Sequence, residues 1–220
     1  MTSTGKLPLR VTVVGLGLIG GSVALDLKAR GFAHEVLGVD ASAENAQLAQ
    51  ELKLVGAVRP LAEAVAEADL VVLAIPVGAM TRVLPEILDL IPETTTVTDM
   101  GSTKAKVCAA VGNHPKRAQF VPSHPMAGTE NSGPSAAKSN LFDRKIAVIC
   151  DHGSVGAEHR ARVEAMYAAL GMRLVFMTPA EHDVHTAFVS HLSHVSSFVL
   201  ANTVLEKEKD VTAIFDLAGG

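Results

Sequence analysis

A histidine between two prolines, His124, is the residue best placed for acid–base chemistry in this chain. It stands in the stretch FVPSHPMAGTE, residues 120–130, where a strand-like apolar run ends at Pro122. Prolines interrupt a ladder of hydrogen bonds, so we do not expect the backbone of His124 to join a ladder. We expect its imidazole to project from the end of the strand into a cleft. A neutral imidazole there can accept a proton from a substrate hydroxyl. A lone histidine is more often structural, but the proline bracket favours a functional role, and Glu130 can reach back over the same place.

A glycine-rich turn near the N-terminus predicts a dinucleotide site. Gly15, Gly17 and Gly20 form a G-x-G-x-x-G directly after a strand and at the start of a helix. Such glycines permit a tight turn, a close approach to a pyrophosphate, and close packing of helix on strand. Asp40 ends the second strand about 20 residues later, where a carboxylate accepts hydrogen bonds from ribose hydroxyls and repels a 2′-phosphate. We therefore predict NAD rather than NADP as the cofactor; the alternative is a structural glycine turn with a surface aspartate.

Two further strand ends provide candidates for the same cleft. Ile75 and Pro76 follow a buried strand, and they either wall the nicotinamide ribose or simply end that strand and start a helix. Ser102, in DMGSTK, offers a hydroxyl to the site, or it is a plain helix N-cap. The predicted cofactor-binding residues are Gly15, Gly17, Leu18, Ile19, Gly20, Asp40, Ile75 and Pro76.

Histidines recur in the segment after Pro179, at positions 182, 185, 191 and 194. His191 and His194 are three residues apart and share a helix face. Since no cysteine lies nearby and no acid lies one turn away on that face, we predict no metal site. Substrate contact or interface packing is the better interpretation of these histidines.

The elements that must position these residues alternate between short apolar strands and longer helical segments. The expected strands are residues 9–14, 36–39, 70–75, 95–98, 119–121, 146–149 and 173–176. Continuous apolar strands imply burial on both faces, and alternation with helices implies parallel pairing. We predict an α/β fold, a doubly wound, mostly parallel Rossmann-type sheet over residues 1–178.

The pattern changes after Pro179, where strand signals and glycines disappear until the end of the chain. Residues 180–209 predict one long helix with Thr178 as N-cap, and a second helical segment begins near Val211. One long helix cannot bury its own apolar face. We therefore expect residues 179–220 to be the start of a helical substrate and dimerisation domain, truncated in this chain.

Composition excludes several classes of protein. The 220 residues are 48% hydrophobic and 19% charged, which is typical of a globular chain. A net charge of −4 without a basic run argues against nucleic acid as a partner. No signal peptide or run of about 18 apolar residues is present, so we expect no membrane contact and a cytoplasmic location. Cys108 and Cys150 are expected to be buried thiols rather than a disulfide.

Four motifs together resemble the prephenate/arogenate dehydrogenase family of tyrosine biosynthesis. In order, these are VGLGLIGGS at 14–22, DMGSTK at 99–104, SHPMAGTE at 123–130 and SHLSH at 190–194. The glycine motif is shared by many dehydrogenases, whereas the two histidine motifs are much more specific.

The resemblance implies an NAD-dependent oxidative decarboxylation of prephenate or arogenate. It implies that His124 accepts the hydrogen bond from the C4 hydroxyl, that Ser102 helps to orient that histidine or the nicotinamide, and that Glu130, His191 and His194 line the substrate pocket. It also implies a homodimer built through the helical domain. In the family that domain continues past a glycine-rich segment to an arginine that binds the substrate carboxylate. The resemblance implies that this chain stops where the glycine-rich segment begins.

Two other functions remain open from the residues alone. One is a β-hydroxyacid-type dehydrogenase with a lysine base on the long helix, although that helix carries no lysine before Glu206. The other is a catalytically silent NAD-binding regulatory module.

Overall fold

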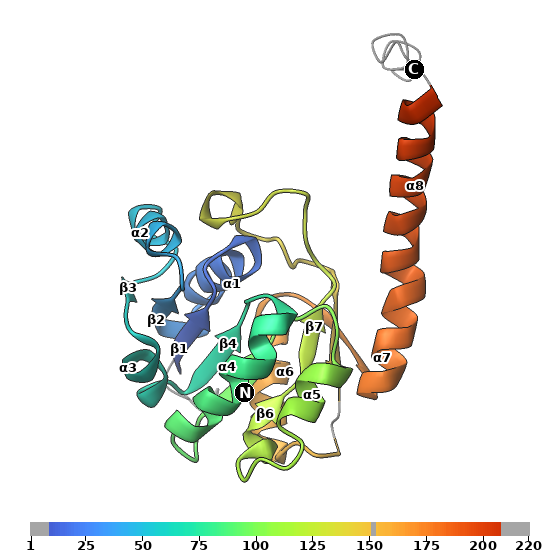
Figure 1. The fold of residues 1–220 in the computed structure, drawn as a ribbon. Coiled ribbons are helices and arrows are strands. Elements are labelled where there is room, and N and C mark those ends of the chain that lie inside the picture. The colour runs from blue at the N-terminus through green and yellow to red at the C-terminus, as the bar shows by residue number, and fades with distance from the viewer. Residues whose placement is uncertain (1–8, 151–152, 208–220) are drawn as a thin grey trace. The chain divides into compact units, whose positions relative to one another are not determined.

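A parallel sheet flanked by helices makes up most of the molecule (Figure 1). The structure is a computed structural model that describes residues 9–150 and 153–207. Its chain divides into two compact units after His182. The domain boundary expected between residues 178 and 179 stays a prediction.

The larger sheet contains six strands within the described residues. These strands are β1 (Leu9–Val14), β2 (Ala33–Val39), β3 (Ala57–Val58), β4 (Leu70–Leu73), β5 (Thr96–Asp99) and β6 (Phe120–Val121). They lie in the order β3-β2-β1-β4-β5-β6, and every neighbouring pair is parallel. This order reverses direction between β1 and β4, which is where ligands bind in such sheets. The predicted doubly wound α/β fold is confirmed.

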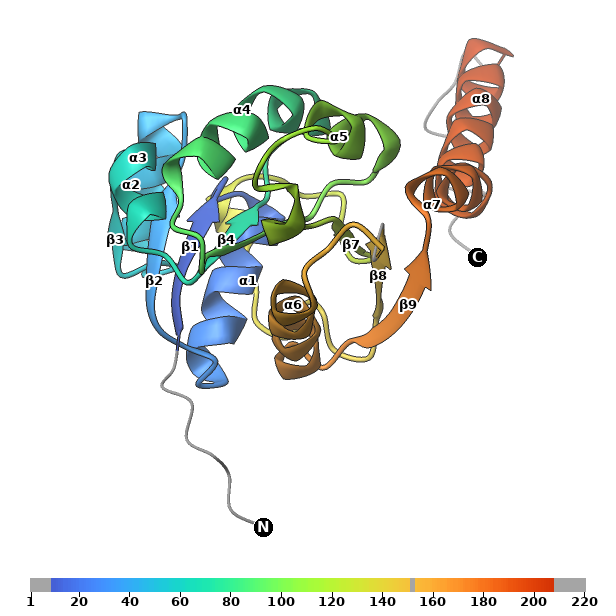
Figure 2. The same ribbon diagram turned by 90° about the horizontal axis from the view of Figure 1, so that it is seen from below.

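Helices cover both faces of this sheet. They are α1 (Leu18–Ala29), α2 (Ala43–Glu51), α3 (Leu61–Ala66), α4 (Val77–Leu90), α5 (Ala105–Ala110) and α6 (Ala157–Ala169). The side chains of α1 and α6 enter one core with β1, and those of α3, α4 and α5 enter a second core on the opposite face. Figure 2 shows α1 and α6 on one side of the strands and α4 and α5 on the other.

The sequence explains why these elements pack in this way. All four residues of β4 are buried, as expected for a strand covered on both faces. In α4, the buried residues Met80, Leu84, Ile87 and Leu88 recur at helical spacing and form one apolar stripe. At the start of β5, the buried His159 of α6 bonds through Nδ1 to Thr96 Oγ1 at 2.8 Å. Burial lowers the pKa of His159, with Glu158 acting in the opposite direction.

A second, three-stranded sheet carries the histidine between the prolines. It consists of β7 (Ser123–Pro125), β8 (Ile146–Cys150) and β9 (Arg173–Met177), with β7 antiparallel to β8. The expectation that His124 would not join a ladder is wrong, since it pairs with Val148. The flanking hydrogen bonds use the Pro122 carbonyl and the Met126 amide, so neither proline has to donate.

A helical segment follows β9. Its first helix, α7 (Pro179–Thr186), begins with a capping box: the Glu181 amide donates to Thr178 Oγ1 at 3.2 Å, and Glu181 Oε2 accepts from the Thr178 amide at 2.8 Å. The predicted N-cap is confirmed. A π-helical turn (Ala187–His191) interrupts the predicted single helix before α8 (Leu192–Lys207). The helix predicted near Val211 lies outside the described residues.

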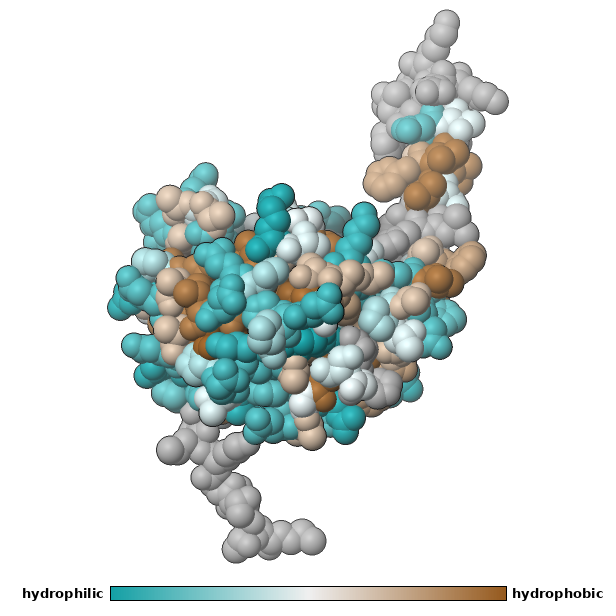
Figure 3. Space-filling model, turned by 60° about the horizontal axis from the view of Figure 1, so that its bottom comes forward, coloured by the Kyte–Doolittle hydropathy of each residue, from teal (hydrophilic) through white to brown (hydrophobic). Residues whose placement is uncertain are grey.

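The segment from residue 183 onward exposes apolar side chains. Among the side chains that the structure describes there, the exposed large hydrophobic ones are Val184, Phe188, Val189, Val195, Phe198, Val199 and Leu200. Figure 3 shows brown, hydrophobic surface on this segment. None of the helices in the described residues is both long and apolar enough to cross a membrane. Cys108 and Cys150 are buried and unbridged, as predicted.

Candidate functional site

The glycine turn between β1 and α1 is shaped so that only glycine fits at two of its positions. Gly15 has a φ of 94°, and an added Cβ would lie 2.6 Å from the Ala74 carbonyl oxygen. A Cβ on Gly20 would lie 1.8 Å from the Gly15 carbonyl oxygen. A Cβ on Gly17 would have only the Gly133 amide nitrogen nearby, at 4.0 Å, so the space above this glycine is open. The turn thus brings α1 close to β1 and leaves a hollow at the helix N-terminus.

The first turn of α1 suits an anion. Gly17 precedes the helix and provides no side-chain cap, and the first turn contains no acidic residue. The N–H groups of such a turn have no intrahelical acceptors, and the helix dipole adds a positive potential there. A pyrophosphate is a ligand that this geometry can hold.

Asp40, directly after β2, is fixed against the same turn. Its Oδ2 accepts from the Leu16 amide at 2.8 Å, and its Oδ1 accepts from the Ser42 amide at 2.9 Å. A carboxylate has about four acceptor sites, so both oxygens keep the capacity to accept from ribose hydroxyls. The carboxylate lines a cavity of about 530 Å³, together with Gly15, Gly17, Ile75 and Pro76.

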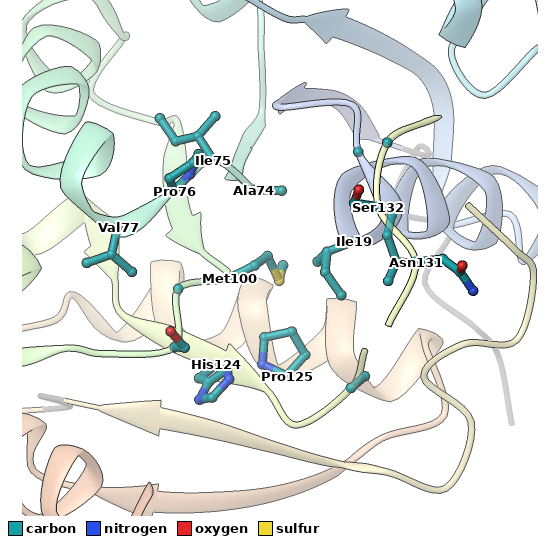
Figure 4. A pocket seen from close by; sticks show the side chains of 16 residues that line it. Ile19, Ala74, Ile75, Pro76, Val77, Met100, His124, Pro125, Asn131 and Ser132 are labelled. Atoms are coloured by element: carbon teal, nitrogen blue, oxygen red, sulfur yellow. The ribbon is translucent and has the colours of Figure 1, made fainter. Parts of the chain in front are cut away.

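A second cavity, of about 430 Å³, adjoins the first. Figure 4 shows it from close by. The side chains that line it include those of Ile19, Met100, His124 and Asn131, which are labelled in the figure. Ser102 lines it as well. Gly17, Ala74, Ile75, Pro76 and Gly133 line both cavities. The two cavities therefore meet at the glycine turn. A dinucleotide, which has a nucleotide on each side of its pyrophosphate, requires this arrangement.

His124 is half-buried and is held by a second histidine. Its Nδ1 lies 2.9 Å from Nε2 of His182, and the two ring centroids are 5.1 Å apart at an interplanar angle of 70°. His182 is fully buried. No local pattern singles out His182 among the four histidines of its segment, because the contact joins residues 58 positions apart.

A buried polar network fixes the strand that carries His124. Lys104 and Asp99 are both fully buried and form an ion pair. Lys104 Nζ also donates to the Ser123 carbonyl at 2.7 Å, and the Ser123 amide donates to Asp99 Oδ1 at 3.1 Å. Ser123 Oγ bonds to Tyr167 Oη at 2.6 Å. The residue preceding His124 is thus held on its backbone and its side chain.

The phenol of Tyr167 stays neutral in this network. Burial raises the pKa of Tyr167, and the hydrogen bond to Ser123 opposes that shift only in part. A neutral hydroxyl can both donate and accept, so it can complete the network beneath β7 without adding charge.

The other predicted site residues lie in different surroundings. Ser102 lines the 430 Å³ cavity, and since α5 begins at Ala105 with Lys104 before it, Ser102 is not the N-cap of that helix. Glu130 is exposed, accepts from Asn131 Nδ2 at 3.3 Å, and is not among the residues that line either cavity. The side chains of His191 and His194 lie outside the described part of the structure.

Comparison with known proteins places this geometry in a family. The family described as "Prephenate dehydrogenase, nucleotide-binding domain" matches residues 23–176, and "Prephenate dehydrogenase, dimerization domain" matches residues 178–220. The chain belongs to the prephenate/arogenate dehydrogenase family. The resemblance inferred from the four motifs is thereby confirmed.

Relatives in this family match nearly the whole chain. Prephenate dehydrogenase of Bacillus subtilis is 32% identical over 213 residues, which is 96% of this chain and 57% of that protein. Cyclohexadienyl dehydrogenase of Zymomonas mobilis is 34% identical over 200 residues, 90% of this chain and 68% of that protein. The chain thus spans between about half and two thirds of the length of these relatives.

A solved structure supports the same assignment of fold. Prephenate dehydrogenase from Aquifex aeolicus, in complex with hydroxyphenyl propionate and NAD+, is 28% identical and superposes with a TM-score of 0.84. The match covers 99% of this chain and 76% of that chain.

Proposed function

We propose that this protein of the prephenate/arogenate dehydrogenase family carries out the NAD-dependent oxidative decarboxylation of prephenate or arogenate. The observation that carries the proposal is the position of His124, in the cavity that begins at the glycine turn. The names of the relatives, prephenate dehydrogenase and cyclohexadienyl dehydrogenase, support the same substrate class.

The residues around the glycine turn fit NAD. The hollow above Gly17 leaves room for a pyrophosphate against the first turn of α1. Asp40 lines the neighbouring cavity, where it would accept from ribose hydroxyls and repel a 2′-phosphate. Ile75 and Pro76, which line both cavities, would wall the nicotinamide ribose.

His124 would take the proton of the substrate hydroxyl. Bound NAD supplies the hydride acceptor. As the C4–H bond breaks, positive charge develops on the carbon that carries the hydroxyl, and an imidazole nitrogen that accepts from this hydroxyl stabilises that charge. Loss of CO2 returns an electron pair to the ring, which becomes aromatic, and His124 gives the proton back to the oxygen on C4, so that the product is a phenol and the histidine is neutral again. Ser102, which lines the same cavity, would help to orient His124 or the nicotinamide through a hydrogen bond of its hydroxyl.

The remaining predicted contacts belong to the same proposal. The substrate would be contacted by Glu130, His191 and His194. Residues 178–220 would contribute to a homodimer, because they match the family's dimerization domain. A cytoplasmic location stays a prediction.

An assay of NADH formation at 340 nm tests the function. We expect the protein to reduce NAD when prephenate or arogenate is added. We also expect isothermal titration calorimetry to show that it binds NAD in the absence of substrate. NAD binding without turnover of either compound would favour a silent NAD-binding module. Turnover of a β-hydroxyacid in place of both compounds would favour the other dehydrogenase class, and absence of NAD binding would refute the proposal outright.

A further inference from the structure

The buried histidine His182 makes a direct ring-to-ring hydrogen bond with His124. Nδ1 of His124 and Nε2 of His182 are 2.9 Å apart, so a single proton lies between them. His182 comes from the first turn of α7, directly after the capping box that fixes where this helix begins. Its side chain is fully buried, so its position is set by packing and not by solvent.

The direction of this bond decides whether His124 can act as a base. A neutral imidazole carries one N–H, and its other nitrogen is an acceptor. If the proton between the rings belongs to His124 Nδ1, then Nε2 of His124 can accept from a substrate hydroxyl. If the proton belongs to His182 Nε2, then His124 carries its own proton on Nε2 and can only donate from there. The role of His124 therefore requires the first arrangement.

We propose that His182 is a positioning residue that accepts from His124 Nδ1–H and so holds His124 in the tautomer whose Nε2 is basic. This inference rests on the proposed role of His124. When His124 takes a proton on Nε2, its Nδ1–H becomes a charge-assisted donor, and the bond to His182 strengthens as positive charge develops. His182 thereby orients the ring before the reaction and stabilises the imidazolium that forms, as the acid of a catalytic triad does.

Nitrogen NMR of the full chain tests the tautomer without requiring turnover. With 15N-labelled histidine, two-bond proton–nitrogen correlations distinguish a protonated from an unprotonated ring nitrogen, and the His124 signals are assigned by their loss in His124→Asn. We expect protonated Nδ1 and unprotonated Nε2 on neutral His124. Protonated Nε2 on His124 would overturn the inference, even if the enzyme is active with prephenate.

Kinetics of variants provide the second test. His182→Leu removes the acceptor and should lower kcat by roughly 100-fold, at the upper end of the ~10–100-fold typical of outer-shell partners and below the ~10⁴-fold of a lost triad acid. His182→Gln can place an amide oxygen near the Nε2 position and should recover most of that loss. Both variants should bind NAD as the wild type does, and His34→Leu, at an exposed histidine of β2, serves as the matched control.

The outcomes separate the inference from the proposed function. If the wild type turns over prephenate or arogenate and His182→Leu does so at the same kcat, His182 has no positioning role. If Gln and Leu reduce kcat equally while NAD binding is retained, acceptance by residue 182 is not what matters. If the wild type turns over neither compound, the proposed function fails, and the NMR result still decides the tautomer.

Discussion

Replacing Lys104 with methionine should destabilise the nucleotide-binding unit strongly. The fully buried ammonium donates to the Asp99 carboxylate and to the Ser123 carbonyl. Lys104→Met keeps the length of the side chain and removes the cation, while the amides of Gly101 and Ser123 still donate to the Asp99 carboxylate. Breaking a buried ion pair from one side costs about 3–5 kcal/mol. With an m-value of about 2 kcal/mol/M, a loss of about 4 kcal/mol lowers the urea midpoint by about 2 M.

Urea unfolding followed by circular dichroism measures this shift. Lys106→Met, at an exposed lysine two residues away, is the matched control and should change the free energy of unfolding by less than about 0.5 kcal/mol. The double variant Asp99→Asn, Lys104→Met removes both charges and should recover part of the loss. A cost below about 1 kcal/mol for Lys104→Met, equal to that of the control, would show that this ion pair does not hold β5 and β7 together.

Three further changes test other parts of the account. Gly20→Ala places a Cβ against a backbone carbonyl, so it should lower the free energy of unfolding by about 1–3 kcal/mol and weaken NAD binding in calorimetry. Gly78→Ala adds a Cβ in open space and should do neither. Equal urea midpoints for the two variants would contradict the close packing at Gly20. Burial lowers the pKa of His159 below its ordinary value of 6.5, so the folded state binds fewer protons than the unfolded chain, and urea midpoints should fall as the pH drops below about 6.5. His159→Gln should weaken the dependence of the urea midpoint on pH. The same dependence in this variant as in the wild type would contradict the role given to His159. Asp40→Ser removes the charge that repels a 2′-phosphate and should raise the ratio of kcat/KM for NADP to that for NAD by roughly 10-fold or more; a constant ratio would contradict its role.

The fold followed from the sequence because its strands are continuous apolar runs bounded by glycines and prolines. The two strands that the sequence did not reveal, Ala57–Val58 and Ser123–Pro125, are only two and three residues long. Strands of this length carry no periodic signal, and β7 contains a proline. The error about His124 has the same origin, since a proline signals a broken ladder only where its N–H would have been used.

The candidate site followed from the sequence only as far as its motifs reach. The glycine turn and Asp40 are local features, so their spacing is readable along the chain. The partnership of His124 with His182 and the burial of Lys104 are not readable, because both arise where segments distant in sequence meet. Lysines usually lie at the surface, and the carboxylate of Asp99 together with the Ser123 carbonyl explains why Lys104 is buried.

The most direct test of the central claim compares His124→Asn with the wild type at saturating NAD and substrate. Asparagine retains a polar group of similar reach but cannot take up a proton, so we predict that kcat falls by about 10²-fold or more while the Kd for NAD stays the same. A variant that reduces NAD at the wild-type rate would contradict the claim that the imidazole of His124 receives the proton of the substrate hydroxyl.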